Sequence, residues 1–565
     1  MQSGQNGASS NGHEPFDHDW IVVGSGFGGS VSALRLSEKG YSVCVLEAGR
    51  RYEDEDFAKT TWNVRRYFWA PKLGLKGIFR MSLFKDLFVV SGSGVGGGSL
   101  GYANTLYQPP AHSAFYRDPQ WSGLEQDWHA ALDPHYRTAE HMLGVTDYEG
   151  EGPADRLLKD LGDDLGVRDT YRTTRVGVFF GEAGETVSDP YFGGEGPDRA
   201  GCIRCGACMV GCRHNAKNTL PKNYLWFAER NGVTVEPERT VVDIRPIGAP
   251  DGSEGYEVVS ERSGAWFAKD RRVQRARGVV VSAGPLGTNK LLQRCRLDGG
   301  LPRVSARLGR RVRSNSEAVG AVTTKDDRHD FTKSIAITSS IFPDEDTHIE
   351  NVTYGRGADS MSFLFWVLTG EGSTLTRPLK ALAAAVRHPL RLLRSSWPFK
   401  WSRRTVILLT MQTIDNHMSL EPRRGLFQRV ARLQTKEDPE KPNPRFIPVH
   451  NRALELAAKR LDATAQSGTT EALMNVPTTA HILGGAVIGE DANSGVIDAN
   501  HRVFGYENLL VCDGAAVPAN VGVNPSLTIT AMAERAMGQI PESSAREDMA
   551  GRADEAMAES AMASA

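Results

Sequence analysis

The chain of 565 residues has no long apolar run and no excess of basic residues. No stretch of about 18 uncharged apolar residues occurs, so we expect no membrane-spanning helix. Residues 1–19 are polar and lack a basic segment followed by an apolar one, so we expect no signal peptide and a cytoplasmic location. Because 66 basic residues are balanced by 68 acidic ones, we expect no nucleic-acid partner.

Cysteine is scarce, and its distribution is uneven. Four of the seven cysteines, Cys202, Cys205, Cys208 and Cys212, lie within one stretch of eleven residues, here called the cysteine cluster. An odd total with one dense group argues against a disulfide framework and indicates a reducing compartment. The C-x-x-C-x-x-C-x-x-x-C spacing is that of a bacterial ferredoxin run, and such thiolates can hold an iron–sulfur cluster, or zinc.

Two features of the cysteine cluster favour a simpler interpretation. Arg213 stands where ferredoxins usually have proline, and the chain contains only one such run. In many ferredoxin runs the fourth cysteine serves a second cluster, which has no counterpart here. We therefore favour reduced, partly buried cysteines that shape a glycine-rich turn, and keep the iron–sulfur cluster as the alternative.

Strand and helix patterns alternate in three separated parts of the chain, which is typical of an α/β fold. The expected strands are 19–24, 42–47, 278–283 and 508–513, and the expected helices are 30–39, 288–294 and 526–537. The segments 60–210 and 310–480 have more aromatic residues, more proline and longer loops. This pattern predicts one nucleotide-binding domain assembled from separated segments, with a substrate domain inserted between them.

A glycine-rich turn follows the first expected strand. Gly24, Gly26 and Gly29 occupy the three positions of G-x-G-x-x-G, ahead of a helix whose N-terminus can bind phosphate. In that motif the first glycine allows a tight turn, the second lets the backbone approach a pyrophosphate, and the third lets the helix pack on the strand. Glu47 ends the next strand, where a carboxylate can bind ribose hydroxyls. This order of elements predicts a dinucleotide site.

Two further segments favour FAD over a nicotinamide. Residues 92–99 form a second glycine-rich loop, which can lie flat against an isoalloxazine ring or a pyrophosphate. Residues 509–514 form a late strand that ends in Asp513 and Gly514, and in FAD folds such an acid lies near the ribityl chain. An enzyme that binds NAD through one glycine motif needs neither segment.

Five stretches of sequence resemble one family over nearly the whole chain. They are GSGFGGSVSALRL (24–36), SGSGVGGGSLGYANT (91–105), VVVSAGPLGTNKLL (279–292), HILGGAVIG (481–489) and NLLVCDGAAVPANVGVNPSLTITAMAER (508–535). The pattern resembles the glucose–methanol–choline (GMC) oxidoreductases, and within them the actinobacterial cholesterol oxidases that hold FAD without a covalent bond. Near residues 98–112 the only histidine is His112, which lacks a recognisable flavin-linking context, so we expect FAD to be releasable.

The resemblance and the segment pattern together imply a domain plan. We expect a Rossmann-like FAD-binding domain from residues 17–60, 214–315 and 478–540, and an inserted α+β substrate-binding domain from 61–213 and 316–477. The loop 90–105 should contact FAD, and residues 1–16 and 541–565 should be disordered. The residues expected at the cofactor are Gly24, Gly26, Phe27, Gly28, Gly29, Glu47, Gly97, Gly98, Asn104, Val241, Asp513, Gly514, Asn524 and Pro525.

Oxidising an alcohol requires an acceptor for the hydride and a group that takes the hydroxyl proton. Flavin N5 takes the hydride. By the resemblance, His481 accepts or relays the hydroxyl proton, and Asn524 hydrogen-bonds the substrate or the flavin edge. A neutral imidazole suits this task because its unperturbed pKa lies near working pH.

The resemblance also raises a second activity, the movement of a steroid double bond by a carboxylate that shuttles a proton. The family has a Gly-x-Glu sequence in the substrate domain, and here the matching stretch contains Asp359, whose reach is one methylene shorter. Glu350 lies nearby in sequence and is a second candidate. A solvated loop acid is an equal alternative for this position, so the oxidation is better supported than the isomerisation.

Two segments, 62–88 and 387–404, interleave aromatic or leucine residues with lysine and arginine. Amphipathic segments of this type bind membrane interfaces, where cations meet anionic lipid. Ordinary packing of the substrate domain is the alternative, and for 62–88 it is the preferred one. Residues 387–404 are therefore the expected site of a peripheral membrane contact.

The sequence thus predicts an FAD-dependent enzyme that oxidises a 3-hydroxysteroid, such as cholesterol, to the ketone with O2 as acceptor. One alternative is an FAD-dependent dehydrogenase of another lipophilic alcohol, which passes electrons to a carrier. A second alternative is a non-catalytic flavin or iron–sulfur protein for electron transfer or lipid binding. The presence of His481 and Asn524 together with the flavin loops argues against the last.

Overall fold

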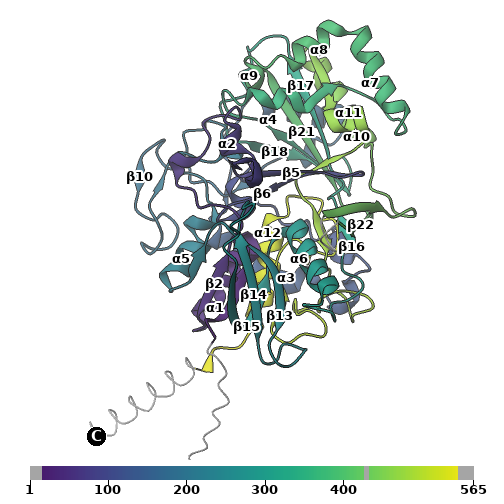
Figure 1. Cartoon of the computed structure of the whole chain (residues 1–565). Helices are drawn as coiled ribbons and strands as arrows, with labels where there is room; N and C mark the ends of the chain where they lie inside the picture. The colour runs from purple at the N-terminus through teal and green to yellow at the C-terminus, as the bar shows by residue number, and fades with distance from the viewer. Residues whose placement is uncertain (1–15, 426–431, 545–565) are drawn as a thin grey trace, which may run out of the picture.

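The computed structural model describes residues 16–425 and 432–544. The ends expected to be disordered, 1–16 and 541–565, lie almost wholly outside the described residues. Figure 1 shows the larger sheets toward opposite ends of the molecule, with β5 and β6 between them. In the part of the chain that the structure describes, no helix has the length and apolarity needed to cross a membrane.

The first sheet has seven strands, in the order β12-β2-β1-β15-β14-β13, with β27 also paired to β15. The strands β12, β2, β1, β15 and β27 are parallel neighbours, whereas β14 pairs antiparallel with both β15 and β13. The bounds are β1 His18–Val23, β2 Val43–Leu46, β12 Thr234–Glu236, β13 Arg239–Pro246, β14 Tyr256–Arg262, β15 Arg272–Val281 and β27 Leu509–Val511.

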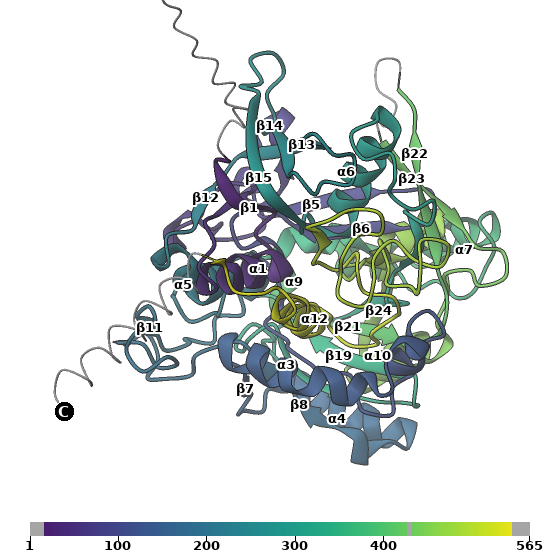
Figure 2. The same ribbon diagram turned by 90° about the horizontal axis from the view of Figure 1, so that it is seen from below.

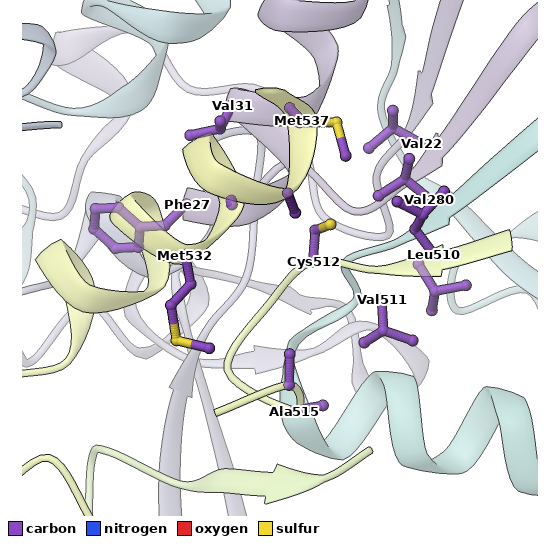
Figure 3. Packing of buried hydrophobic residues seen from close by; sticks show 14 of the residues in the cluster. Val22, Phe27, Val31, Val280, Leu510, Val511, Cys512, Ala515, Met532 and Met537 are labelled. Atoms are coloured by element: carbon purple, nitrogen blue, oxygen red, sulfur yellow. The ribbon is translucent and has the colours of Figure 1, made fainter. Parts of the chain in front are cut away.

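Helices cover the parallel part of this sheet, because β2 and the Trp20–Val23 part of β1 are apolar and must be buried on both faces. In Figure 2, α1 (Phe27–Glu38) and α12 (Ser526–Gly538) lie side by side, with α3 (Trp128–Met142) next to α12. Figure 3 shows Phe27 and Val31 of α1 and Met532 and Met537 of α12 packed near the strand residues Val22, Val280 and Leu510. The two terminal parts of the chain therefore share one core.

The second sheet also has seven strands, in the order β20-β24-β17-β21-β19-β18-β8, and all neighbours are antiparallel. Two helices, α10 (Pro448–Arg460) and α4 (Pro153–Leu165), pack on it and form a separate core. The bounds are β8 Arg172–Thr173, β17 Ala318–Thr324, β18 Ile337–Ile341, β19 Thr347–Val352, β20 Phe365–Val367, β21 Thr405–Gln412 and β24 Ala463–Gly468.

Smaller elements complete the described chain. A four-stranded sheet contains β16 Arg310–Arg313, β22 Met418–Arg423, β23 Arg432–Glu437 and β26 Leu483–Gly485, and a three-stranded sheet contains β5 Phe79–Leu83, β6 Phe88–Gly92 and β25 Thr478–Thr479. Strand pairs are formed by β3 Trp69–Ala70 with β4 Leu75–Lys76, β7 Thr146–Asp147 with β9 Arg175–Val176, and β10 Thr186–Val187 with β11 Arg199–Ala200. The other helices are α2 Val64–Tyr67, α5 Tyr224–Arg230, α6 Gly284–Asp298, α7 Thr376–Arg387, α8 Pro389–Ser396, α9 Trp401–Arg404 and α11 Thr469–Met474.

The expected α/β class and the Rossmann-like sheet are confirmed. The strands predicted at 19–24, 42–47 and 508–513 are β1, β2 and β27, and the helix predicted at 526–537 is α12. Two elements are longer than expected, since 278–283 overlaps the end of β15 and 288–294 lies within α6. The domain limits given above stay a prediction.

Candidate active site

A cavity of about 1080 Å³ is lined by residues of both larger sheets. From the expected cofactor set, its walls contain Gly24, Gly26, Phe27, Gly28, Glu47, Gly97, Gly98, Val241, Asp513, Gly514, Asn524 and Pro525, together with His481. Gly29 and Asn104 are not part of this lining. The structure therefore brings together side chains that are up to about five hundred residues apart in sequence.

The first glycine loop is shaped by close backbone approaches. Gly24 has φ +99°, a left-handed conformation that favours glycine. A Cβ atom on Gly29 would lie 2.0 Å from the carbonyl oxygen of Gly24, and one on Gly28 would lie 1.7 Å from that of Cys512. A Cβ atom on Gly26, in contrast, would meet no protein atom within 4 Å. Close packing of the backbone thus requires glycine at positions 24, 28 and 29. The space beside Gly26, in contrast, is not filled by protein atoms.

Glu47, directly after β2, holds the first glycine loop in place through hydrogen bonds. Its Oε2 accepts hydrogen bonds from the backbone N–H (3.0 Å) and hydroxyl (2.7 Å) of Ser25, and its Oε1 accepts one from the N–H of Gly49 (2.7 Å). The second glycine loop abuts the first, since a Cβ on Gly97 would lie 2.7 Å from Cα of Gly26. The two glycine-rich segments, distant in sequence, therefore form one wall of the cavity.

Asp513 follows β27 and is buried at the cavity wall. It accepts hydrogen bonds from the Thr288 hydroxyl (2.5 Å) and the Ala515 N–H (2.7 Å). Burial raises the pKa of Asp513 to about 6, although these hydrogen bonds oppose the rise. Thr288, at the start of α6, was not expected at the site, although it lies inside one of the family stretches.

His481 and Glu317 form a hydrogen-bonded pair at the cavity wall. Nδ1 of the imidazole is hydrogen-bonded to Oε1 of Glu317, and Oε2 of Glu317 accepts from the Ala480 N–H at 2.8 Å. Burial alone would lower the pKa of His481, but the charge and hydrogen bond of Glu317, with help from Glu350, raise its pKa above the ordinary value. Sequence reasoning missed Glu317 and expected an unperturbed imidazole.

Asn524 and Glu350 form a second pair. Nδ2 of Asn524 donates to Oε2 of Glu350 at 3.2 Å. Glu350 is fully buried, and burial raises its pKa to about 8, although the hydrogen bond from Asn524 opposes the rise. Oδ1 of Asn524 and Oε1 of Glu350 are buried and have no hydrogen-bond partner in the described chain. Of these two atoms, Oδ1 of Asn524 belongs to a residue that lines the cavity, as His481 does.

The segment before β17 connects the two pairs. Asn315 has a left-handed backbone, with φ +57°. Its side chain donates to the carbonyl of Val523 at 3.0 Å and accepts from the N–H of Gly522 at 2.8 Å. Asn315 therefore holds the loop that carries Asn524, while Glu317, two residues later, holds His481.

Asp359 lies elsewhere. It begins the 3-10 helix Asp359–Leu364, and its Oδ1 accepts hydrogen bonds from the backbone N–H (2.8 Å) and hydroxyl (2.7 Å) of Ser402. It is not among the residues that line the cavity. Glu350 is also outside that lining, but it contacts Asn524, which is part of it.

One part of the cavity is apolar. Its walls come from the second sheet and nearby segments and include Val319, Ile337, Val352, Met361, Leu364, Phe365, Ile407 and Leu409. Aromatic residues of 62–88 also contribute, namely Tyr67, Phe68, Trp69 and Phe79. Four of the seven aromatic residues of 62–88 therefore line the cavity, which agrees with the packing interpretation preferred for that segment.

The cysteine cluster contains four free thiols that line a second, small cavity. Asn104, expected at the flavin, lies beside the thiol of Cys208. Its assignment to the flavin stays a prediction.

Comparisons with known proteins agree with this geometry. A family model described as GMC oxidoreductase matches residues 401–533, and an NAD(P)-binding Rossmann-like model matches residues 22–52. A cholesterol oxidase of Acinetobacter baumannii is 47% identical over 95% of this chain and 96% of its own length. A cholesterol oxidase of Mycobacterium tuberculosis is 48% identical over 93% of this chain and 91% of its own. The chain belongs to the GMC oxidoreductase family.

As a GMC oxidoreductase the chain is an FAD-dependent enzyme. A solved structure with the same fold is pyridoxine 4-oxidase from Mesorbium loti, with a TM-score of 0.59 and 16% identity over 92% of this chain and 98% of the other. An FAD-dependent oxidoreductase from Chaetomium thermophilum is a second, with a TM-score of 0.53 and 15% identity over the same shares of the two chains. At these identities the likeness concerns the fold.

The residues present fit FAD. The open space at Gly26 adjoins the N-terminus of α1, where no side chain caps the helix, so its first N–H groups remain available to a pyrophosphate. Glu47 and Asp513 border the same cavity and suit hydroxyl groups of the ribose and ribityl chains. Arg80 of β5 also lines the cavity, near the charge of Glu47, and could neutralise phosphate.

Proposed function

We propose that this GMC oxidoreductase oxidises the 3-hydroxyl group of a cholesterol-like steroid to a ketone. The observation that carries the proposal is one cavity in which an apolar wall, suited to a rigid hydrocarbon, adjoins the paired residues His481–Glu317 and Asn524–Glu350. Relatives named cholesterol oxidase, which match over more than nine-tenths of the chain, support it.

Each of these polar groups has a specific role in the proposed oxidation. His481 takes the hydroxyl proton through Nε2, because its Nδ1 is engaged by Glu317. The buried charge of Glu317 stabilises the imidazolium that results. The free Oδ1 of Asn524 accepts from or orients the substrate hydroxyl. Bound FAD supplies the hydride acceptor.

We also propose that FAD is held without a covalent bond. His112, the candidate for a linkage within residues 98–112, is not part of the cavity lining.

Steroid isomerisation, if it follows oxidation, is assigned to Glu350 in preference to Asp359. A proton shuttle takes the ring proton as the carboxylate and returns it as the acid, and a pKa raised to about 8 lets the Glu350 carboxyl hold the proton between the two steps. Its Oε1 is free, whereas Asp359 is engaged by Ser402. This ranking reverses the order suggested by the sequence.

The proposed electron acceptor is O2, which becomes hydrogen peroxide. The test is peroxide release with cholesterol, compared with its analogue that lacks the 3-hydroxyl. Peroxide and a 3-ketosteroid in equal amounts from cholesterol, and neither from the analogue, would support the proposal. Turnover only with an added electron carrier would favour the dehydrogenase alternative, and turnover of long-chain alcohols but not sterols would reject the steroid. A long-chain-alcohol oxidase of Arabidopsis thaliana, 24% identical, makes that last comparison useful.

The proposed source of the steroid is an anionic bilayer, contacted by a helical surface over the apolar part of the cavity. This surface, here called the helical cap, consists of α7, α8 and the turn that follows (375–400). Figure 1 shows α7 and α8 far from the first sheet. Both helices contact β20, whose Phe365 lines the cavity. The helical cap thus lies directly outside the cavity wall.

The helical cap is apolar and cationic. Its exposed apolar side chains are Leu375, Leu379, Leu382, Val386, Leu390, Leu393, Trp397 and Phe399. Its exposed cations are Lys380, Arg387, Arg391, Arg394 and Lys400, and residues 372–414 contain no aspartate or glutamate. Such a surface binds lipid through apolar burial and attraction to anionic headgroups. The predicted segment 387–404 covers only about half of the helical cap, because the sequence analysis did not include α7. Trp401, which belongs to the predicted segment, is buried and lies outside the cap.

A further inference from the structure

The cysteine cluster lies in a tightly folded loop between β11 and the segment that leads to α5. Left-handed backbone conformations occur at Arg204 (φ 52°), Gly206 (φ 68°) and Gly211 (φ 100°). These bends turn one short segment back on itself, so that all four cysteine side chains border the same small cavity. None of the four is oxidised to a disulfide.

Backbone N–H groups are directed at the sulfur atoms. The N–H of Arg204 donates to Sγ of Cys202 at 3.4 Å, and the N–H of Ala207 is hydrogen-bonded to the Cys205 thiol. A neutral thiol is a weak acceptor, whereas a metal-bound thiolate carries negative charge and accepts well. Hydrogen bonds to sulfur are one of the ways in which proteins tune iron–sulfur clusters. The loop is therefore arranged to stabilise negative sulfur.

Lys217 supplies a positive charge at the same place. The residue is buried, and Nζ donates to three carbonyl oxygens, those of Leu100 (3.0 Å), Tyr102 (2.8 Å) and Cys208 (2.9 Å). The thiols of Cys208 and Cys212 lie near this ammonium group. A buried ammonium without an anion is unfavourable, so an anionic group in this cavity would complete the arrangement.

Asn104 lies next to the cysteine cluster and has unfilled hydrogen-bonding capacity. It is fully buried with φ +73°, and neither of its polar side-chain atoms has a hydrogen-bond partner of normal geometry in the described chain. Its side chain lies beside the thiol of Cys208. Buried amides are otherwise almost always paired.

The arrangement does not suit a single ion. Among residues 16–425 and 432–544, no three His, Cys, Asp or Glu side chains are placed to hold one metal ion. Thiolates around a four-iron cluster stand farther apart than those around zinc, because the iron–sulfide core lies between them. We propose that Cys202, Cys205, Cys208 and Cys212 hold an iron–sulfur cluster of the four-iron type. Its net negative charge would lie against Lys217.

The proposed site shares a wall with the cavity of the active site. Met209, which follows Cys208, lines that cavity, as does Tyr102, whose carbonyl binds Lys217. This inference goes beyond the proposed function and does not depend on the identity of the alcohol.

The test is metal and sulfide analysis of the full-length FAD-loaded protein, purified without oxygen. We expect about four iron and about four acid-labile sulfide ions per chain, and a broad absorption near 400 nm that remains after FAD is removed. The variant Cys205→Ser should lose at least about half of the iron. The matched control is Cys44→Ser, which alters a buried thiol of β2 outside the cluster and should retain all of it.

Several results would overturn the proposal. They are less than about half an iron per chain after anaerobic reconstitution with ferrous iron and sulfide, zinc in place of iron, or equal iron in Cys205→Ser and wild type. FAD content reports folding of the Cys205→Ser variant, and Cys208→Ser provides a second ligand variant. Iron analysis is independent of steroid turnover, so a protein that binds iron but does not oxidise cholesterol would contradict the proposed function alone.

Discussion

Glu317, whose side chain is fully enclosed, holds Nδ1 of His481 although 164 residues separate the two. A buried carboxylate beside an imidazole fixes the orientation of the ring and stabilises its protonated form. The raised pKa of His481 follows from this contact. The same contact determines how the rate should depend on pH.

Replacing Glu317 with glutamine should change that pH dependence. If His481 must be neutral to accept the hydroxyl proton, the rate rises as pH increases through the pKa of His481. Glu317 raises that pKa, so Glu317→Gln should move the acid limb of kcat/KM to lower pH. The plateau rate should also fall by roughly 10–100-fold, because the imidazolium loses its counter-charge. A pH profile of kcat/KM measures both effects, and an unmoved limb would show that another group controls it.

Glu350→Gln should separate the two proposed activities. The ketone should still form at a rate within about tenfold of wild type, while the isomerised product disappears. Asp359→Asn is the matched control and should change neither product, because an amide oxygen can still accept from Ser402. Chromatography of the steroid products distinguishes the two variants. Loss of isomerised product in Asp359→Asn alone would assign the shuttle to Asp359.

Glu350→Gln should also stabilise the protein against heat, increasingly so at higher pH. Burial raises the pKa of the Glu350 carboxyl from 4.5 to about 8 in the folded protein. Its contribution to stability is therefore fully present below pH 4.5 and is lost as pH rises toward 8. The melting temperature of the variant should therefore exceed that of wild type by more at pH 8 than at pH 5. A gap that is constant with pH would mean that Glu350 is not buried as a neutral acid.

Gly26→Ala should weaken FAD binding without damaging the fold. The added Cβ meets no protein atom within 4 Å, but it occupies the space where the backbone should approach a pyrophosphate. We expect FAD affinity to fall by roughly tenfold or more, with an unchanged circular dichroism spectrum of the FAD-free protein. Gly28→Ala is the contrasting variant and should fold poorly, because its Cβ would lie 1.7 Å from a carbonyl oxygen. Full FAD affinity in Gly26→Ala would remove the pyrophosphate from this position.

Changes to the helical cap should affect membrane binding and not the chemistry. The double variant Leu390→Ser, Leu393→Ser should bind vesicles of phosphatidylcholine and phosphatidylserine at least about fivefold more weakly than wild type. Oxidation of cholesterol dispersed in detergent should be unchanged. Phe267→Ser, which alters an exposed apolar side chain in the β14–β15 hairpin, should bind vesicles normally. Co-sedimentation measures the binding, and equal binding by all three proteins would show that the helical cap is not the contact.

The cofactor half of the site could be predicted because it is built from local signals. The order of strand, glycines, helix and acid needs only neighbouring residues, and two residues that it picks out, Gly26 and Glu47, line the cavity. Their contacts with the cofactor stay predictions. His481 and Asn524 were found through the family stretches, and both line the same cavity. Their catalytic roles stay proposals.

The partners of those residues could not be predicted in the same way. Glu317 and Asn315 lie in no motif, and they reach the site only because the segment before β17 folds against two distant loops. Glu350 could not be ranked above Asp359 until their burial and partners were visible. The amphipathic pattern of α7, with Leu379, Leu382 and Val386 exposed on one face, was a usable signal.

The most direct test of the account is an anaerobic one. Cholesterol in detergent is mixed with the FAD-loaded protein, and the flavin absorption band is followed in wild type and in His481→Ala. We predict that wild type bleaches with one cholesterol oxidised per flavin and recovers in air, while His481→Ala retains FAD and bleaches roughly 10²–10⁴-fold more slowly. If wild type does not bleach with cholesterol, the steroid assignment is wrong, and if His481→Ala bleaches at the wild-type rate, His481 is not the proton acceptor.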